Sequence, residues 1–120
     1  MCEVYTRAKA KMLDDKINHR FKTLRFRLFI EQQNGGIADD CEALVPCATG
    51  LVPFKSANNA ARINAGLELI DTLAEYYRVQ LPVFIDNAES VTRIQRTNTQ
   101  VIRLVVSEQD KALRFEKGDI

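Results

Sequence analysis

The stretch PVFIDNAESV, residues 82–91, decides the fold. Four apolar residues lead directly into Asp86, and the polar residues Asn87, Glu89 and Ser90 follow it. A short, wholly apolar run between polar segments is typical of a buried parallel strand. Open α/β sheets bind ligands outside the carboxyl ends of such strands. The pattern therefore predicts a strand that ends at Asp86 and presents its carboxylate as part of a candidate site.

A second strand pattern lies at residues 100–106, where VIRLVV is again mostly apolar. The segment between it and the strand at 82–86 has room for a crossover with a short helix, so the two strands are expected to be parallel. SEQDK at 107–111 predicts a turn, and ALRFE at 112–116 predicts a last strand beyond it. The chain is therefore of the α/β class, with a short mixed sheet that contains a parallel strand pair.

Residues 56–78 carry the clearest helix pattern of the chain. Ser56 is the predicted N-cap, and Asn58 and Asn59 also favour a helix start. Gly66 lowers helix stability by about 1 kcal/mol relative to Ala, which predicts close backbone packing against the next strand. The predicted apolar stripe is Ile63, Leu67, Ile70, Ala74 and Tyr77, and the opposite, polar stripe is Asn64, Glu68, Asp71, Glu75 and Arg78.

Residues 3–20 also predict a helix, because they contain good helix formers without Gly or Pro. Their apolar positions form only a narrow stripe. A narrow stripe indicates a helix with one thin contact seam rather than a helix buried in a core. The stripe consists of Tyr5, Ala8, Met12, Leu13 and Ile17.

A β-hairpin is predicted next, because the hydrophobic period changes to two after Phe21. Asn34-Gly35-Gly36 supplies residues that accept positive φ, which is a strong hairpin signal. CEALVPC at 41–47 is the returning strand, and ATGLVPF at 48–54 is a turn followed by a short extended segment. In the first strand Leu24, Phe26, Leu28 and Ile30 are expected on one face and Arg25, Arg27 and Glu31 on the other.

The composition suits a single domain over residues 1–120, with 46% hydrophobic and 28% charged residues. No apolar run approaches the roughly 20 residues of a membrane span, and the N-terminal sequence lacks the apolar region of a secretory signal. We therefore expect a cytoplasmic protein without membrane partners. Cys2, Cys41 and Cys47 are odd in number and lack metal-type spacing, which favours reduced packing thiols.

The net charge of +1 conceals an uneven distribution along the chain. Residues 1–30 carry eight basic and three acidic side chains, whereas the remainder carries nine basic and thirteen acidic ones. A basic first quarter is typical of a nucleic-acid surface, or of a face that contacts the acidic remainder or simply water. The candidate DNA-binding residues are Lys22, Arg25 and Arg27, since Arg25 and Arg27 share one expected hairpin face.

Asp86 has two interpretations at this level. An apolar strand ending in Asp is the Walker B pattern, in which the carboxylate holds the Mg²⁺ of a bound nucleotide. Many buried strands, however, end in an Asp that merely caps the next turn. The polar cluster at the start of the 56–78 helix adds a candidate anion site, because a helix N-terminus offers free N–H groups. A plain capped helix is the alternative there.

The order of these elements resembles the C-terminal half of the ATPase head in coiled-coil ABC-type ATPases of the SMC and SbcC kind. KINHRFKTLRFRLFIEQQNGGI resembles the returning coiled-coil helix and its hairpin, so residues 1–20 correspond to the coiled-coil root and 21–120 to the C-terminal ATPase lobe. KSANNAARINAGLELI is similar to the signature motif and its helix, VFIDNAES to Walker B and the D-loop, and VIRLVVSEQD to the strand before the switch residue.

This resemblance implies roles for the polar residues within a complete head. Ser56, Asn58 and Asn59 would be signature-like contacts to ATP, and Asp86 would hold Mg²⁺. Glu108, after Ser107, stands at the switch position. The resemblance also implies a DNA surface near the coiled-coil root.

The sequence departs from that family at three points. It contains no GxxxxGK[ST] motif and therefore lacks the phosphate cradle. The general-base Glu of the family is replaced by Asn87, which can orient a water molecule but cannot take its proton. Glu89 is the only nearby substitute, and the switch position carries Glu108 instead of His.

Two functions follow as expectations. The first is an ATPase lobe that supplies signature and Walker B elements, uses ATP and Mg²⁺ only together with a P-loop lobe, and is inactive alone. The second is a non-catalytic binding or structural module that keeps the fold. A free-standing metal-dependent hydrolase fits poorly, because Glu89 and Glu108 are the only further acidic candidates near Asp86. In either case exposed apolar surface predicts association, with a P-loop lobe or as a homo-oligomer through residues 3–20 or the hairpin edge.

Overall fold

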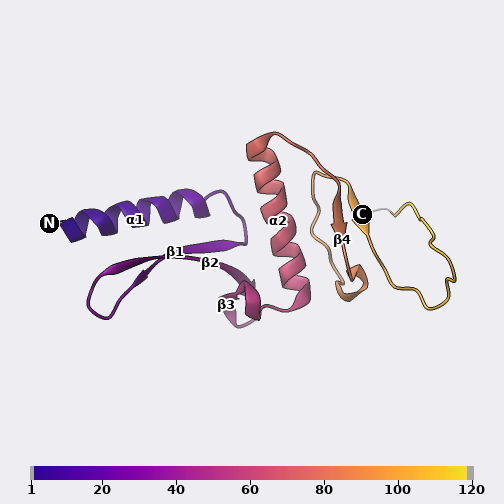
Figure 1. Cartoon of the computed structure of the whole chain (residues 1–120), viewed down its shortest axis with the longest axis horizontal. Helices are drawn as coiled ribbons and strands as arrows, with labels where there is room; N and C mark the ends of the chain where they lie inside the picture. Colours follow the sequence, from indigo (N-terminus) through magenta and orange to yellow (C-terminus); the bar gives the residue numbers. More distant parts are fainter. Residues whose placement is uncertain (1, 119–120) are drawn as a thin grey trace.

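The computed structural model describes residues 2–118 and shows a mixed α/β architecture (Figure 1). A three-stranded antiparallel sheet and a two-stranded parallel sheet lie on either side of one long helix. In chain order the elements are α1 (Cys2–Asn18), β1 (Arg25–Glu31), β2 (Ile37–Cys47), β3 (Gly50–Pro53), the 3₁₀ turn η1 (Phe54–Ser56), α2 (Asn59–Tyr77), β4 (Val83–Ile85), the 3₁₀ turn η2 (Ala88–Ser90) and β5 (Val101–Arg103).

The predicted hairpin is confirmed. β1 and β2 pair in antiparallel register around the Asn34-Gly35-Gly36 turn, and Gly35 has the positive φ of 83° that this turn needs. The register shifts between Arg27 and Phe29, where β2 carries one extra residue. Such a bulge interrupts the alternation of faces. The extra residue lies in β2, so it leaves the two-face pattern predicted for the first strand uninterrupted, although Ile30 near the end of β1 is 43% exposed.

Helix α2 is the central element, because it contributes to two separate cores. On one side Ala65 packs with Leu24 of the hairpin layer and Val45 of β2. On the other side Leu67 packs with Ile85 of β4 and with Ala88. Figure 1 shows α2 standing between the two sheets. A helix covered on two flanks has no single apolar stripe, so the predicted division into one apolar and one polar face is only partly right.

The parallel strand pair is confirmed. Val83, Phe84 and Ile85 of β4 pair in parallel with residues 101–103 of β5. The last predicted strand, residues 112–116, does not form. After β5 the chain makes a loop that ends at Gly118, where an added Cβ would lie 3.2 Å from Nη2 of Arg103. Figure 1 shows this loop extending away from β5.

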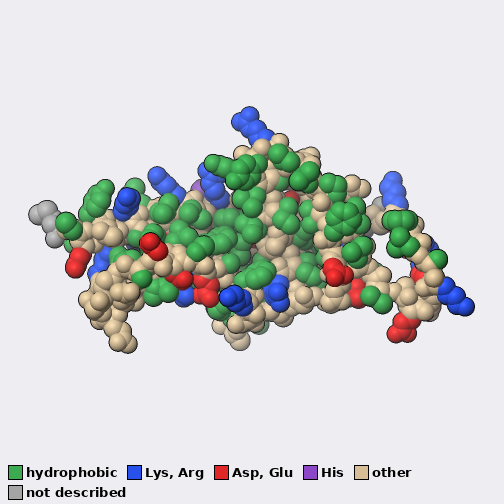
Figure 2. Space-filling view, in the orientation of Figure 1, with side chains coloured by type: hydrophobic (Ala, Val, Ile, Leu, Met, Phe, Trp, Pro, Cys, Tyr) green, Lys and Arg blue, Asp and Glu red, His purple; other side chains and the backbone are tan. Residues whose placement is uncertain are grey.

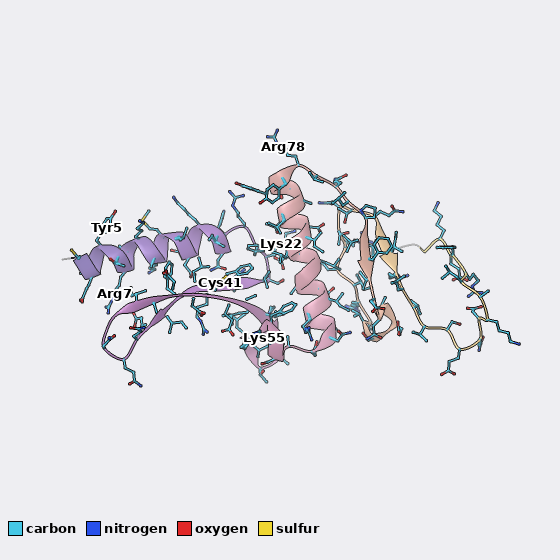
Figure 3. All side chains as sticks on the ribbon, viewed as in Figure 1. Tyr5, Arg7, Lys22, Cys41, Lys55 and Arg78 are labelled. Atoms are coloured by element: carbon cyan, nitrogen blue, oxygen red, sulfur yellow. The ribbon has the colours of Figure 1, made fainter. Side chains whose placement is uncertain are left out.

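Helix α1 is confirmed, but its contact face differs from the predicted one. Ala10 is its buried residue, whereas Tyr5 and Met12 of the predicted stripe are exposed. Figure 3 shows Tyr5 pointing away from the hairpin. The end of α1 is fixed to β1 by the Asn18 side chain, which donates to the Phe26 carbonyl oxygen and accepts from the Phe26 N–H at 2.9 and 2.7 Å.

Two predictions about α2 are corrected by its local geometry. Asn58 is the N-cap, since its side chain accepts from the Ala61 N–H, and Ser56 instead lies in η1. A Cβ added to Gly66 would meet nothing within 4 Å, so no close packing requires this glycine. The three cysteines are free thiols, as expected, but Cys2 and Cys41 are exposed and are not packing residues.

The chain is elongated, with extents of 67 × 32 × 20 Å and a radius of gyration of 18.6 Å. A compact domain of this length has a radius of gyration of about 13.6 Å. Figure 2 shows hydrophobic side chains spread across the visible face. Within residues 2–118, no helix is long and apolar enough to cross a bilayer.

Candidate functional site

The candidate site lies at the carboxyl end of β4, where Asp86 begins a tight turn. The Asp86 side chain is exposed, and its Oδ1 accepts from the N–H of Asn87 at 2.9 Å. Asn87 adopts the left-handed conformation with φ of 56°, which Asn tolerates better than most residues. Ala88 then donates its N–H to the Leu104 carbonyl oxygen just beyond β5. The turn is thereby held to the ends of both parallel strands.

The first turn of α2 is bonded to the same turn. Asn59 Nδ2 donates to Ser90 Oγ at 2.5 Å, and Ser90 Oγ donates to the Asn87 carbonyl oxygen at 2.8 Å. The structure therefore brings together Asn59 and the Asp86–Ser90 turn, which are separated by about 30 positions in the sequence. Asn58 is occupied by its capping bond to Ala61, and Ser56 lies one turn earlier.

Asn64 provides a second link between α2 and the crossover. Its Nδ2 donates to the Arg93 carbonyl oxygen at 3.1 Å, and its Oδ1 accepts from the Gln95 N–H at 2.8 Å. The Asn64 side chain thus uses both its donor and its acceptor group to bind the backbone of the crossover. The sequence pattern placed Asn64 only on a polar helix face and gave no sign of this role.

Glu68 is the main residue that sequence reasoning missed. It is 4% exposed although it was assigned to the polar face of α2. Its carboxylate accepts from the backbone N–H groups of Lys22, Thr23 and Leu24 and from the Thr23 hydroxyl. Burial raises the pKa of Glu68, but these four hydrogen bonds outweigh it, so the net pKa lies below the ordinary 4.5.

The acidic residues near Asp86 do not form a multidentate cation site. Glu89 is exposed in η2, and Glu108 is exposed in the loop after β5. No cluster of three or more His, Cys, Asp or Glu side chains suited to a metal occurs among residues 2–118. Asp86 is the carboxylate that directly follows β4.

The three DNA-binding candidates differ in their surroundings. Arg27 forms salt bridges with Asp40 and Glu42 of β2 at 3.1 and 2.5 Å. Arg25 Nη1 donates to the carbonyl oxygens of Phe21 and Leu24. Lys22 is exposed and forms no ion pair with any residue the structure describes. Figure 3 labels it at the junction of α1, β1 and α2.

Two open clefts lie on either side of Arg20, and neither includes the Asp86 turn. One, of about 670 Å³, is lined by residues 15–17, His19 and Arg20 at the end of α1. The other, of about 420 Å³, is lined by Arg20 and the last turns of α2. The Asp86 turn lines neither of these two clefts, and the Asp86 side chain is exposed.

Comparisons with known proteins gave no match: the chain fits no family profile and is not significantly similar to any curated protein or solved structure.

Proposed function

We propose that this chain is one lobe of a two-part nucleotide-binding ATPase of the SMC/SbcC type and is completed by a P-loop lobe on another polypeptide. The observation that carries the proposal is the connection between Asp86 and the α2 N-terminus. Asp86 follows a strand of a parallel pair, and Asn59 is bonded to the same turn through Ser90. A ligand-binding edge in open α/β sheets has this arrangement.

The state of Asp86 is compatible with a cation ligand. Its Oδ1 accepts from Asn87, and its Oδ2 has no hydrogen-bond partner among residues 2–118. A carboxylate oxygen that is exposed and free is a suitable ligand for Mg²⁺, which commonly binds through one or two carboxylates plus nucleotide phosphates. In the complete head Asp86 would hold this ion, and the free N–H groups at the start of α2 would face phosphate.

The isolated lobe is expected to be inactive. The chain has no P-loop to cradle phosphates, and Asn87 occupies the position of the general base. Asn87 would orient a water molecule, and Glu89, the other carboxylate of the turn besides Asp86, would accept its proton. The two-stranded sheet also favours a missing partner, because two strands alone are marginally stable.

A second candidate is a binding module without nucleotide chemistry. The specific observation in its favour is that most polar groups of the site bind one another. Asn59, Ser90 and Asn87 form one chain of hydrogen bonds, and Asn58 caps α2. These contacts maintain the local fold even if no ligand binds.

DNA contact is a further part of the proposal and depends mainly on Lys22 and the basic side chains of α1. Arg27 is neutralised by two carboxylates, so it contributes less to an electropositive surface. A duplex titration at two salt concentrations tests this. We expect weak, salt-sensitive DNA binding that Lys22→Glu reduces and Arg27→Gln leaves nearly unchanged. An equal loss of DNA binding in both variants would show that the hairpin is part of the DNA-binding surface.

The proposal is tested by Mg²⁺-ATP titration of the chain alone and of the chain bound to a candidate P-loop polypeptide. Calorimetry should show no binding at micromolar affinity or tighter to the isolated chain and clear binding to the complex. Micromolar binding by the isolated chain would contradict the account of a lobe. A complex that binds no nucleotide would favour the non-catalytic module.

A further inference from the structure

The loop after β5 is an exposed arm that carries several apolar side chains and pairs with no strand within the described part of the chain. We define the arm as residues 104–118. It leaves the sheet at Leu104 and returns beside Arg103 at Gly118. Leu113 and Phe115 on this arm are 82% and 85% exposed, and Val106 is 79% exposed. Single exposed apolar residues are ordinary, but several on one short arm mark an interaction surface.

The sequence of the arm is that of a strand. Residues 113–116 alternate between apolar and charged side chains, so Leu113 and Phe115 share one face of an extended segment. Arg114 and Glu116 share the other face, and their side chains meet at 3.0 Å. These residues nevertheless pair with no strand in the described structure. A strand-forming segment without a partner is a template for pairing with another chain.

We propose that the arm pairs with the same arm of a second copy, in antiparallel register about Phe115. This proposal does not depend on nucleotide binding, because it uses no residue of the Asp86 turn.

Charge selects this register. In a two-fold antiparallel pair centred on Phe115, Arg114 of each copy lies opposite Glu116 of the other. Centring the pair on Arg114 or on Glu116 would place like charges opposite each other, which is destabilising. A register displaced by one residue would place the apolar face of one arm on the charged face of the other. Among these registers, the one centred on Phe115 is the one in which Arg114 and Glu116 attract each other.

Surface area also favours a second copy. The chain exposes 10018 Å², whereas a folded monomer of this size exposes about 6,600 Å². The excess of about 3,400 Å² is several times the roughly 800 Å² that each partner contributes to an interface of standard size. The arms alone make a short ribbon. On the face that carries Phe115, Leu113 of each copy lies opposite Lys117 of the other, so this face is apolar at its centre and charged at its two ends.

The charge pattern provides a decisive test by sedimentation velocity, carried out without nucleotide over a wide range of protein concentration. The unmodified chain is expected to dimerise. Arg114→Glu and Glu116→Arg should each weaken the dimer by about fivefold or more, because two attractive cross-strand pairs become two repulsive ones. The double variant should restore dimerisation. Met12→Glu on α1, which changes an apolar residue outside the arm that is 60% exposed, should have no effect.

The register is tested by disulfide formation in a background with all three native cysteines replaced by Ser. Phe115→Cys places two thiols directly opposite each other, within the Cα separation that a disulfide needs. Arg114→Cys places them diagonally, beyond that separation. Mild oxidation should therefore cross-link the first variant efficiently and the second poorly. The proposal would be overturned if the chain were monomeric or if only Met12→Glu disrupted the dimer. Equal cross-linking of the Phe115→Cys and Arg114→Cys variants would also overturn it.

Discussion

The carboxylate of Glu68 on α2 accepts hydrogen bonds from both the backbone N–H and the hydroxyl of Thr23, 45 positions earlier in the chain. Thr23 lies between α1 and β1, so this contact fixes the path of the chain from the first helix into the hairpin. Glu68 is nearly fully buried, and its four donors satisfy it. Buried charges are tolerated in proteins when they are hydrogen-bonded in this way.

Glu68→Ala is expected to lower the free energy of unfolding by about 2–3 kcal/mol, because it leaves three backbone N–H groups without their acceptor. Urea unfolding followed by circular dichroism measures the change. Glu75→Ala is the matched control, since Glu75 is exposed on the same helix, and it should change stability by less than about 0.5 kcal/mol. Equal effects of the two substitutions would show that the Glu68 contacts are not structural.

Stability should fall in acid because the pKa of Glu68 is lowered by folding. A carboxyl group with a folded pKa below its unfolded pKa stabilises the protein above the unfolded pKa, and the contribution is lost as pH falls through the folded pKa. Glu68→Gln removes this titration. The urea midpoint of the variant should therefore decline less steeply below pH 4.5 than that of the unmodified chain. If the urea midpoints of both proteins fell equally with pH, titration of Glu68 would not be the cause of the loss of stability in acid.

Asn58→Ala should destabilise the protein by about 1 kcal/mol, because Asn58 is the N-cap of α2 and accepts from the Ala61 N–H at 2.8 Å. Ser56→Ala is the control and should have little effect, since Ser56 lies in η1 and the side chain that caps α2 is that of Asn58. Thermal or urea unfolding distinguishes the two. A larger loss of stability in Ser56→Ala than in Asn58→Ala would show that Ser56 is the N-cap, as the sequence predicted.

Gly66→Ala should stabilise the chain by about 0.5–1 kcal/mol, because alanine has the higher helix propensity and its Cβ would meet no atom within 4 Å. The measurement is the urea midpoint of the isolated chain. A loss of stability would mean that Gly66 packs closely in the folded protein. If the Gly66→Ala substitution stabilised the isolated chain but weakened its binding to a P-loop lobe, the glycine would belong to that interface.

The sequence predicted those elements whose signals are local. Asn34-Gly35-Gly36 specified the hairpin, and the apolar runs near Val83 and Val101 specified two strands whose crossover made them parallel. It did not predict which faces of α2 are buried, because a helical repeat cannot show that sheets cover two flanks. Glu68 was misassigned for this reason, since the donors that stabilise it lie in the distant segment 22–24.

The prediction of a last strand at 112–116 was wrong for a related reason. Residues 113–116 have the alternation of a strand, but pairing requires an edge of another strand, which no pattern within the segment can supply. The candidate site was predicted in part: the position of Asp86 after β4 followed from the sequence. The bond between Asn59 and Ser90 did not, because it depends on how α2 packs against the crossover.

The central claim, that Asp86 is the metal-holding carboxylate of a two-part ATPase, is tested most directly by ATP hydrolysis. The chain is combined with its P-loop partner, and Mg²⁺-dependent turnover is compared for the unmodified chain, Asp86→Asn and the control Asp15→Asn on α1. We expect turnover only in the complex, its loss in Asp86→Asn by at least about a hundredfold, and no change in Asp15→Asn. Full turnover with Asp86→Asn would contradict the claim.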